Sequence, residues 1–373
     1  MNKNVSLDRY FTLGRTGLRV SRLALGTMTF GTDWGWGADK ETARQLVNTY
    51  CDAGGNFFDT ADMYTNGTSE TWLGEFIADA GARDKAVIAT KFSYNAQPGN
   101  PNAGGNGRKN ILRAIEASLK RLGTDYIDLY ILHTWDRVTP AEEVMRTLDD
   151  LVRSGKVRHV GLSDVPAWYA SRAQSIAEFR GYEPIAAIEL EYSLAQRAIE
   201  DEFVPFGTEH GVGILAWAPL ANGLLSGKYR PSEDGTAQGG RFALLKDHPA
   251  LTKPNERNWA IVSELEAVAK ALDHSMAEVA LNWVANRPGV ASVLVGATKV
   301  NQLEQNIAAL SFEIPAELRQ RLDSVSAPER TFPYVLFGDA VQGLIHGDVT
   351  VGAKRSGYFP DVAVSGSGAT VAA

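Results

Sequence analysis

Short apolar segments alternate with amphipathic segments along most of this 373-residue chain, and no other feature restricts its fold as strongly. From residue 59 to residue 217, successive apolar segments end about 30 to 40 residues apart, which is the length of one strand, one loop and one helix. Near-continuous apolar strands, each followed by a helix, are typical of a parallel sheet covered by helices. The predicted strands are 23–26, 56–59, 86–90, 127–132, 157–162, 186–190, 213–217 and 292–296.

Eight strands of this kind favour a closed (β/α)8 TIM barrel, which typically takes about 250 residues. A doubly wound open sheet is the alternative, but no GxGxxG fingerprint follows the first strand. An N-terminal β-hairpin with its turn at Arg15-Thr16-Gly17 is expected to plug the bottom of the barrel. Two Gly-rich insertions, Ser93–Arg108 and Tyr229–Arg241, follow strands and are expected to overhang the active face.

The barrel pattern ends near Pro315, where a helix, AELRQRLDSV, leads into an irregular C-terminal extension. We therefore predict one domain over residues 1–373, with its core at about 10–325 and a tail at 326–373. The last nine residues, SGSGATVAA, have the composition of a disordered end.

Composition excludes several classes of protein. The net charge of −7 provides no global field for nucleic acid. Cys51 is the single cysteine, and the six histidines lack the paired spacing of a metal site, so we expect neither a disulfide nor a metal. The N-terminus lacks the apolar run of a signal peptide, and no stretch is apolar for long enough to span a membrane. We expect a cytoplasmic protein with no membrane partner.

Three consecutive predicted strands end in polar residues that can meet at one face of a barrel. Asp59 follows NFF, Lys91 follows AVIAT and His133 follows IDLYIL, while Tyr64 lies in the loop after Asp59. Polar residues at the carboxyl ends of barrel strands converge on the active site. Each of these residues alone has an ordinary structural explanation, as an ion-pair partner or a surface tyrosine. Together they can perform one reaction.

That reaction is the protonation of a developing alkoxide. A free tyrosine has a pKa near 10, which makes it a poor acid at neutral pH. An ammonium group stabilises the phenolate and lowers that pKa, and a carboxylate keeps the ammonium charged and in place. A histidine can hydrogen-bond the reacting oxygen. Asp59, Tyr64, Lys91 and His133 are therefore the candidate catalytic residues.

The ordered motifs resemble those of the aldo-keto reductase family. They run from LGRTGLRVSRLALGTMTFG through DTADMY, ATKF, YIDLYILHTWD, GKVRHVGLSD, LEYSLAQR and APLANGLLSGKY to VGATKVNQLEQN, and so cover roughly Tyr10 to Pro360. Within the family, the chain is most similar to the branch with potassium-channel β-subunit-like and bacterial reductases. The resemblance implies a TIM barrel, a nicotinamide cofactor and reversible reduction of aldehydes or ketones.

By resemblance, Tyr64 is the general acid, Lys91 lowers its pKa, Asp59 holds Lys91, and His133 orients the carbonyl. Tyr192 would stack under the nicotinamide ring, and Ser163 would bond its carboxamide. The resemblance also implies a set of cofactor-binding positions at the ribose, the pyrophosphate loop and the adenosine end. These are Gly26, Thr27, Met28, Asp59, Asp164, Glu189, Trp217, Pro219, Leu220, Gly223, Gly296, Thr298, Lys299, Gln302, Gln305 and Asn306.

Two positions depart from the usual pattern of the family. Asp164 stands where Asn is usual, and Glu189 stands where Gln is usual. Ionised carboxylates only accept hydrogen bonds, whereas amides donate and accept. We expect both carboxyl groups to bond the carboxamide NH2, with ion pairing to a nearby cation as the alternative for Glu189. Lys299 and Thr298 offer a charge and a hydroxyl for a phosphate, although less than a bidentate arginine. The resemblance to the family, more than these residues, implies NADPH rather than NADH.

Substrate contacts are expected from aromatic residues in the loops and at strand ends. The candidates are Trp34, Trp36, Phe92, Trp135 and Trp217. They fit a sizeable apolar carbonyl or alcohol substrate, or else simple packing against the barrel rim. Two alternatives to the reductase remain at this point. One is a cofactor-binding regulatory subunit with slow turnover, and the other is a metal-dependent barrel hydrolase or isomerase. The sequence does not predict an oligomeric state.

Overall fold

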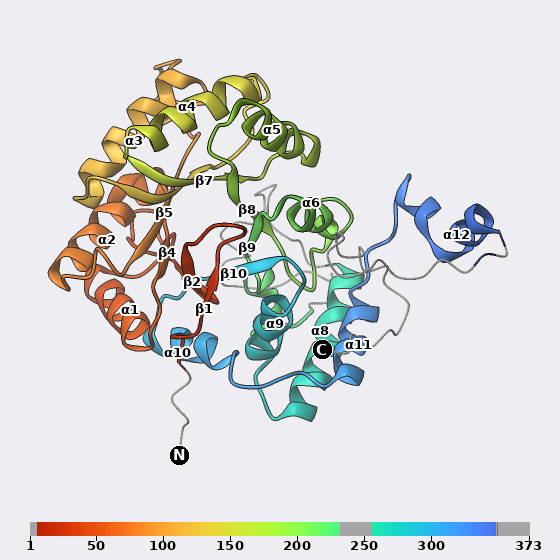
Figure 1. Ribbon diagram of the computed structural model, residues 1–373. Coiled ribbons are helices and arrows are strands. Elements are labelled where there is room, and N and C mark those ends of the chain that lie inside the picture. The colour runs from red at the N-terminus through yellow and green to blue at the C-terminus, as the bar shows by residue number, and fades with distance from the viewer. Residues whose placement is uncertain (1–5, 232–254, 348, 350–373) are drawn as a thin grey trace.

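The computed structural model describes residues 6–231, 255–347 and 349 and consists of a closed parallel barrel surrounded by helices (Figure 1). The order of strands around the barrel is β10-β3-β4-β5-β6-β7-β8-β9, and every neighbouring pair is parallel. The predicted TIM barrel is therefore confirmed. The barrel strands are β3 (Leu23–Gly26), β4 (Phe57–Asp59), β5 (Val87–Phe92), β6 (Ile127–Leu132), β7 (Val157–Ser163), β8 (Ile185–Glu191), β9 (Gly213–Trp217) and β10 (Val290–Val295).

Helices cover the outside of the barrel, as their 3.6-residue apolar periodicity predicts. Two of them show how local sequence sets their bounds: Asp39 caps α1 by accepting from the Thr42 amide, and Ser275 forms a capping box with Glu278 at the start of α9. The covering helices are α1 (Lys40–Asp52), α2 (Thr68–Asp79), α3 (Arg108–Leu122), α4 (Ala141–Arg153), α5 (Ala167–Arg180), α6 (Phe203–His210), α8 (Glu256–Leu272), α9 (Met276–Ala285), α10 (Val300–Ala308) and α11 (Ala316–Val325).

Hydrophobic side chains form two cores on opposite sides of the strands. The larger one fills the space between strands and helices, and the smaller one fills the inside of the barrel. Side chains alternate between these two cores along each strand, because successive residues of a strand point to opposite faces. This alternation decides which residues can reach the barrel mouth.

The N-terminal hairpin closes the bottom of the barrel, as predicted. β1 (Tyr10–Thr12) pairs antiparallel with β2 (Arg19–Ser21), and the hairpin lies across the barrel in Figure 1. Leu13 and Val20 are buried in the inner core. A Cβ at Gly14 would lie 2.5 Å from the Gly211 carbonyl oxygen, so the close contact requires glycine there.

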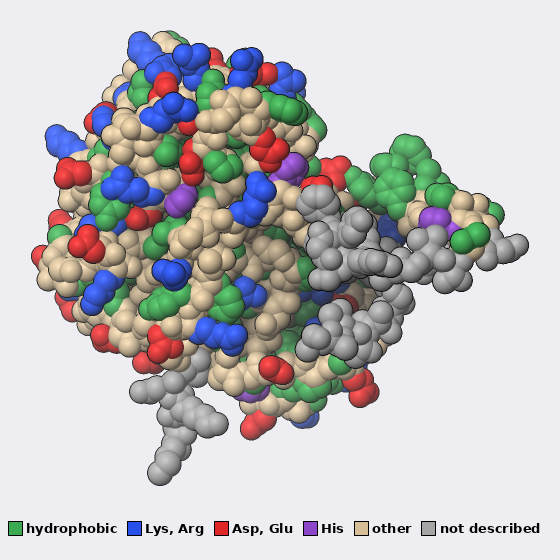
Figure 2. Space-filling model, viewed as in Figure 1, with side chains coloured by type: hydrophobic (Ala, Val, Ile, Leu, Met, Phe, Trp, Pro, Cys, Tyr) green, Lys and Arg blue, Asp and Glu red, His purple; other side chains and the backbone are tan. Residues whose placement is uncertain are grey.

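The C-terminal extension contains a helix that the sequence analysis missed. The irregular tail predicted after α11 includes the 3-10 helix η4 (Tyr334–Phe337) and α12 (Asp339–His346), which project from the barrel (Figure 1). Hydrophobic side chains gather on this projection, where Phe332 and Leu344 are exposed (Figure 2). The short helix carries apolar residues without a buried partner surface, so periodicity alone could not separate it from a coil.

Of the two Gly-rich insertions, the first is described and the second, Tyr229–Arg241, lies mostly outside the described residues. The segment after β5 folds back on itself, since the Gly105 amide bonds the Ser93 carbonyl at 2.7 Å. Asn106 donates to the Thr134 carbonyl at 2.9 Å, which ties the insertion to the loop after β6. The insertion therefore lies at the active face. The predicted disordered end, Ser365–Ala373, also lies outside the described residues. No helix in the described part of the chain is long and apolar enough to cross a membrane.

Candidate active site

Lys91 joins three of the four predicted catalytic residues in one buried cluster. Its Nζ atom donates to both carboxylate oxygens of Asp59 at 2.6 and 2.7 Å, and to the Thr60 carbonyl at 3.0 Å. The Tyr64 hydroxyl lies 3.3 Å from the same nitrogen. Because β4 and β5 are neighbours in register, Asp59 and Lys91 reach the same end of the barrel interior. The structure thus brings this part of the predicted tetrad together.

A tight turn after β4 places Tyr64. The turn includes the 3-10 helix η1 (Tyr64–Gly67), in which Thr65 and Asn66 have positive φ angles of 44° and 55°. The Thr65 hydroxyl donates to the Phe30 carbonyl at 2.7 Å and so fastens the turn to the loop after β3. The phenol ring is 8% exposed, which leaves Tyr64 buried but at the edge of the site.

His133 completes the group from the end of β6. Its ring lies edge-on to the Tyr64 ring, with centroids 5.8 Å apart. Burial and the neighbouring Lys91 ammonium hold the pKa of His133 well below its usual value. The imidazole is therefore neutral at physiological pH and can donate one hydrogen bond without carrying charge.

The electrostatics of Tyr64 differ from the sequence-based expectation. Burial raises the pKa of the Tyr64 hydroxyl, and the Lys91 ammonium offsets only part of that rise. Burial alone would lower the pKa of Lys91, but the Asp59 carboxylate beside it raises that pKa overall. The phenol therefore keeps its proton in the protein as described, and the ammonium limits how unfavourable the phenolate is.

Glu189 is a second carboxyl group on the same ammonium. Its Oε1 atom lies 3.4 Å from Lys91 Nζ, and its Oε2 atom is buried without a hydrogen-bond partner. Burial and the Asp59 charge raise the pKa of Glu189 well above its usual value. Ion pairing, the alternative that the sequence analysis left open for Glu189, is thus present, although the contact is longer than those of Asp59. Asp164 is placed differently, because its Oδ1 accepts from Trp217 Nε1 at 3.2 Å and burial raises its pKa to about 6.

Three buried polar atoms on neighbouring strands have no hydrogen-bond partner among the residues that the structure describes. They belong to side chains at or just after the ends of β6, β7 and β8, namely His133 Nδ1, Ser163 Oγ and Glu189 Oε2. Unpaired buried polar atoms are costly, so such atoms gather where a ligand supplies the partners. A hydroxyl donor beside a carboxyl group matches a carboxamide, whose C=O accepts and whose NH2 donates. Ser163 and Glu189 therefore fit the nicotinamide carboxamide.

Two further predicted cofactor segments lie at the ends of β9 and β10. Pro219, Leu220 and Gly223 belong to the loop after β9, where Ala221, Asn222 and Gly223 all have positive φ angles. The Asn222 amide nitrogen is buried and has no hydrogen-bond partner in the described part of the chain, which makes Asn222 an additional anion-binding candidate that the sequence analysis missed. The feature that identifies Asn222 is the run of residues with positive φ angles, and this run can be seen only in the structure.

The adenosine-end candidates surround the start of α10. The Thr298 amide donates to Gln302 Oε1 at 3.0 Å, and Lys299 is exposed as the residue that precedes the helix. Gly296 and Gln305 are exposed as well, whereas Asn306 is buried. A helix N-terminus with an exposed lysine suits an anionic group.

At the end of β3, one of the predicted cofactor residues has a structural role. Gly26 and Met28 are partly exposed, but the Thr27 side chain is fully buried. Its hydroxyl bonds the Asp59 carbonyl at 3.0 Å and the Ser69 hydroxyl at 2.7 Å. Thr27 therefore ties β3 to β4 and α2, and its side chain is not available to a ligand.

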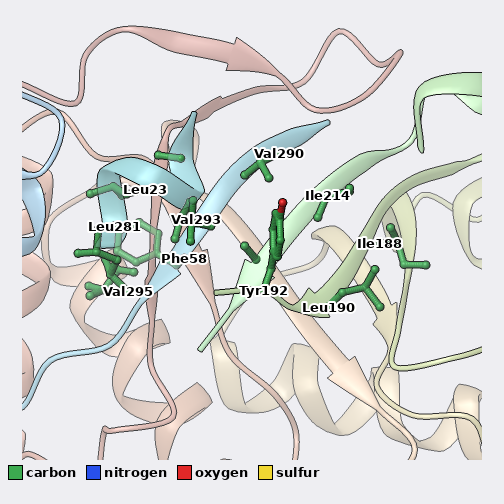
Figure 3. Close-up of a cluster of buried hydrophobic side chains, with 14 of the residues drawn as sticks. Leu23, Phe58, Ile188, Leu190, Tyr192, Ile214, Leu281, Val290, Val293 and Val295 are labelled. Atoms are coloured by element: carbon green, nitrogen blue, oxygen red, sulfur yellow. The ribbon is translucent and has the colours of Figure 1, made fainter. Parts of the chain in front are cut away.

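The stacking role predicted for Tyr192 is wrong. Tyr192 is 1% exposed and packs edge-on against Trp283 among apolar side chains outside the barrel (Figure 3). Its hydroxyl donates to Glu200 at 2.6 Å and accepts from Arg287 at 3.0 Å. Glu189 faces into the barrel, so the alternation of side chains puts Tyr192, three positions later, on the outer side.

Phe92 is excluded from the substrate site for the same reason. Lys91 points into the barrel, so Phe92 points outward, where it is fully buried and packs against Tyr130 with ring centroids 4.8 Å apart. Trp217, by contrast, is partly exposed at the end of β9 and packs on the inner core. Trp217, unlike Tyr192 and Phe92, is therefore accessible to a ring stacked against it from the barrel mouth.

Partly exposed aromatic residues surround this end of the barrel. Trp34 and Trp36 pair in the loop after β3, with centroids 5.7 Å apart. Trp135, in the loop after β6, contacts the exposed Trp168 at 5.4 Å. Tyr94 lies edge-on to the His133 ring at 5.0 Å. Trp168 and Tyr94 were not predicted, because a lone aromatic residue in a loop carries no sequence signal for its position.

A TIM barrel with an Asp–Tyr–Lys–His group at the carboxyl ends of its strands defines an oxidoreductase of the aldo-keto reductase class. The chain matches the Aldo/keto reductase family model over residues 22–327. It therefore belongs to the aldo/keto reductase family, and the resemblance noted in the sequence is confirmed.

Individual relatives cover most of the chain. An uncharacterised oxidoreductase of Bacillus subtilis is 37% identical over 326 residues, which is 85% of this chain and 95% of that protein. An aryl-alcohol dehydrogenase [NADP(+)] of Phanerodontia chrysosporium is 34% identical over 361 residues, 92% of this chain and 90% of its own. A probable voltage-gated potassium channel subunit beta of rice is 35% identical over 336 residues, 87% of this chain and 99% of its own.

Proposed function

We propose that this chain reduces aldehydes or ketones with NADPH and oxidises the corresponding alcohols in reverse. The observation that carries the proposal is the Tyr64 hydroxyl, which lies 3.3 Å from a fully buried Lys91 ammonium that Asp59 holds in place. A phenol beside a fixed ammonium can give up its proton at the moment when an alkoxide forms.

Each residue has one task in this reaction. When bound, a reduced nicotinamide supplies the hydride. Tyr64 donates its hydroxyl proton to the carbonyl oxygen, and the Lys91 ammonium stabilises the phenolate that remains. Neutral His133 donates a hydrogen bond to the same oxygen and so orients and polarises the carbonyl. In alcohol oxidation the phenolate of Tyr64 accepts the proton instead.

Several residues would hold the cofactor. Ser163, Glu189 and Asp164 would bind the carboxamide, and the loop with Asn222 and Gly223 would bind the pyrophosphate. Lys299 and Thr298 supply a charge and a hydroxyl for a 2′-phosphate, which supports NADPH, with NADH as the alternative. The Phanerodontia chrysosporium relative bears NADP(+) in its name, which supports the same preference.

Trp217 would provide the aromatic surface for the nicotinamide ring, in place of Tyr192. We expect Trp217→Ala to weaken NADPH binding about tenfold or more, because a stacked aromatic contact and its buried apolar area are lost. Tyr192→Phe is the matched control, since it should leave cofactor affinity unchanged and lower the unfolding free energy by about 1 kcal/mol. Fluorescence titration and denaturant unfolding measure the two effects. Unchanged NADPH binding in Trp217→Ala would contradict the stacking role of Trp217.

The substrate we propose is an aromatic aldehyde or ketone, or the matching alcohol. Tyr94, Trp135 and Trp168 place aromatic faces beside His133 and the loop after β6. Aromatic rings pack favourably against one another. A relative from Pestalotiopsis microspora is named an aryl-alcohol dehydrogenase, which supports this substrate class.

The test begins with titration of the protein with NADPH and with NADH, followed by a panel of carbonyl compounds. We expect tighter binding of NADPH and loss of reduced cofactor with aryl aldehydes faster than with short aliphatic ones. Cofactor binding without turnover of any carbonyl compound would contradict the reductase and favour a regulatory subunit. Faster turnover of small polar carbonyls would contradict the aromatic substrate class only.

A further inference from the structure

Two carboxyl groups share one ammonium at the base of the site, and within residues 6–231 and 255–347 Lys91 is the one cation that pairs with both of them. Lys91 contributes one positive charge, whereas ionised Asp59 and Glu189 would together contribute two negative charges. All three side chains are at least 96% buried. An unbalanced buried charge is costly, and two carboxyl groups at one site rarely both ionise. The cluster is therefore expected to retain one proton.

That proton belongs on Glu189. Both oxygens of Asp59 lie within 2.7 Å of the ammonium, so the Asp59 carboxylate is strongly stabilised. Glu189 has a single, longer contact of 3.4 Å with the ammonium, and its other oxygen has no hydrogen-bond partner among the described residues. A carboxyl group that gains less from the ammonium keeps its proton to a higher pH. The pKa of Glu189, raised by burial and by the Asp59 charge, agrees with this placement.

A ligand in the site would contact Glu189 at its unpartnered Oε2 atom. Glu189 is paired in register with Ser163 on β7, whose hydroxyl is also buried without a partner. A nicotinamide at this position changes charge during turnover, since the reduced ring is neutral and the oxidised ring is cationic. A nearby carboxylate favours the cationic ring, and a cationic ring favours the carboxylate.

We propose that Glu189 switches its proton with the redox state of the cofactor: it keeps the proton while a reduced nicotinamide is bound and releases it to solvent when an oxidised one is bound. The inference rests on the proposed function, because it needs a nicotinamide at this site. An amide at the same position could bond the carboxamide but could not change charge. The carboxyl group at position 189 thus makes the affinity for oxidised cofactor, relative to reduced cofactor, depend on pH.

Other ionisable groups lie near Glu189, and their titration must be distinguished from that of Glu189. Asp59 approaches it from β4, Lys91 from β5 and Tyr64 from η1, and Asp164 follows the end of the adjacent strand β7. The pKa of Asp164, raised to about 6 by burial, makes it the main competitor. Asp62, whose pKa burial raises to about 7, is a further buried carboxyl group. The wild type alone therefore cannot show which group releases the proton, and variants at position 189 are needed to assign it to Glu189.

The experiment compares wild type, Glu189→Gln and Asp164→Asn. Dissociation constants for NADP+ and NADPH are measured by fluorescence between about pH 6 and pH 9, and proton release is measured by calorimetry in buffers of different ionisation enthalpy. In the wild type, the ratio of the NADPH to the NADP+ dissociation constant should rise by up to about tenfold per pH unit where Glu189 titrates. The 2′-phosphate titrates in both cofactors, so its contribution cancels from the ratio.

Glu189→Gln should remove the pH dependence and the extra proton release on NADP+ binding, and it should favour NADPH by about tenfold relative to the wild type above neutral pH. Asp164→Asn removes the competing carboxyl group and should retain the pH dependence and the proton release above about pH 7, where Asp164, with a pKa of about 6, is already ionised. Glutamine is isosteric and leaves Lys91 paired with Asp59, so this variant should fold. A ratio that is independent of pH in the wild type, or dependence that persists in Glu189→Gln, overturns the switch but leaves the proposed function intact. Absence of binding to either cofactor overturns both.

Discussion

Tyr64→Phe should lower the rate of carbonyl reduction by about 10²–10⁴-fold, which is the usual contribution of a positioned general acid. The substitution removes the hydroxyl that lies 3.3 Å from Lys91 Nζ and preserves the ring that packs edge-on to His133. Because the phenol is the group that loses a proton to the substrate oxygen, the loss should appear in kcat and kcat/KM together. Steady-state kinetics with an aryl aldehyde measure it.

Cofactor affinity separates this effect from a general disturbance of the site. NADPH should bind Tyr64→Phe with nearly the wild-type dissociation constant, since the hydroxyl contacts Lys91 rather than the residues proposed for the cofactor. The pH profile is a second control: the wild-type rate of alcohol oxidation should rise with pH as Tyr64 ionises, and burial moves that rise upward. Retention of more than about a tenth of the wild-type reduction rate would exclude Tyr64 as the acid.

The catalytic group could be predicted from the sequence because the barrel imposes a rule on strand ends. Asp59, Lys91 and His133 end or follow consecutive strands, and neighbouring parallel strands bring such residues to one edge. A boundary error of one or two residues did not matter here. Lys91, for example, lies inside β5 rather than after it, yet its side chain still reaches the barrel interior.

The same rule, applied to side-chain direction, would have corrected two predictions. Phe92 follows the inward Lys91, and Tyr192 lies an odd number of residues after the inward Glu189, so alternation sends both rings to the outer core. Trp217 ends β9 on the inner side and remains partly exposed. The sequence motif suggested an aromatic contact, but only strand direction selects the ring that can make it.

The electrostatics of the site could not be predicted from the sequence. Lys91 near Tyr64 implied a lowered pKa for the hydroxyl, but burial outweighs the ammonium. Likewise, a carboxyl group at position 189 looked like an acceptor for the carboxamide, whereas the structure shows it sharing the Lys91 ammonium with Asp59. Both results depend on distances and burial among residues of β4, η1, β5 and β8, and residue identity alone does not encode them.

The largest effect on stability is expected from Lys91→Met. This change keeps most of the side-chain volume but leaves Asp59 and Glu189 buried without their shared ammonium. Removal of one partner from a buried ion pair costs about 3–5 kcal/mol of unfolding free energy at neutral pH. Denaturant unfolding at several pH values measures the loss, and carbonyl reduction should disappear with it because the phenolate of Tyr64 loses its stabilising charge.

The pH dependence of that loss identifies its cause. Without Lys91, the pKa values of both carboxyl groups in the folded protein lie above their unfolded values, so the native state binds more protons than the unfolded chain. Stability should then fall as pH rises from about 4 through the folded pKa values, and the deficit should be smallest in acid. Asp59→Asn combined with Lys91→Met removes the carboxylate that had paired with the ammonium and should recover part of the lost stability. A deficit that is the same at every pH would instead mean that lost packing, rather than uncompensated charge, destabilises the variant.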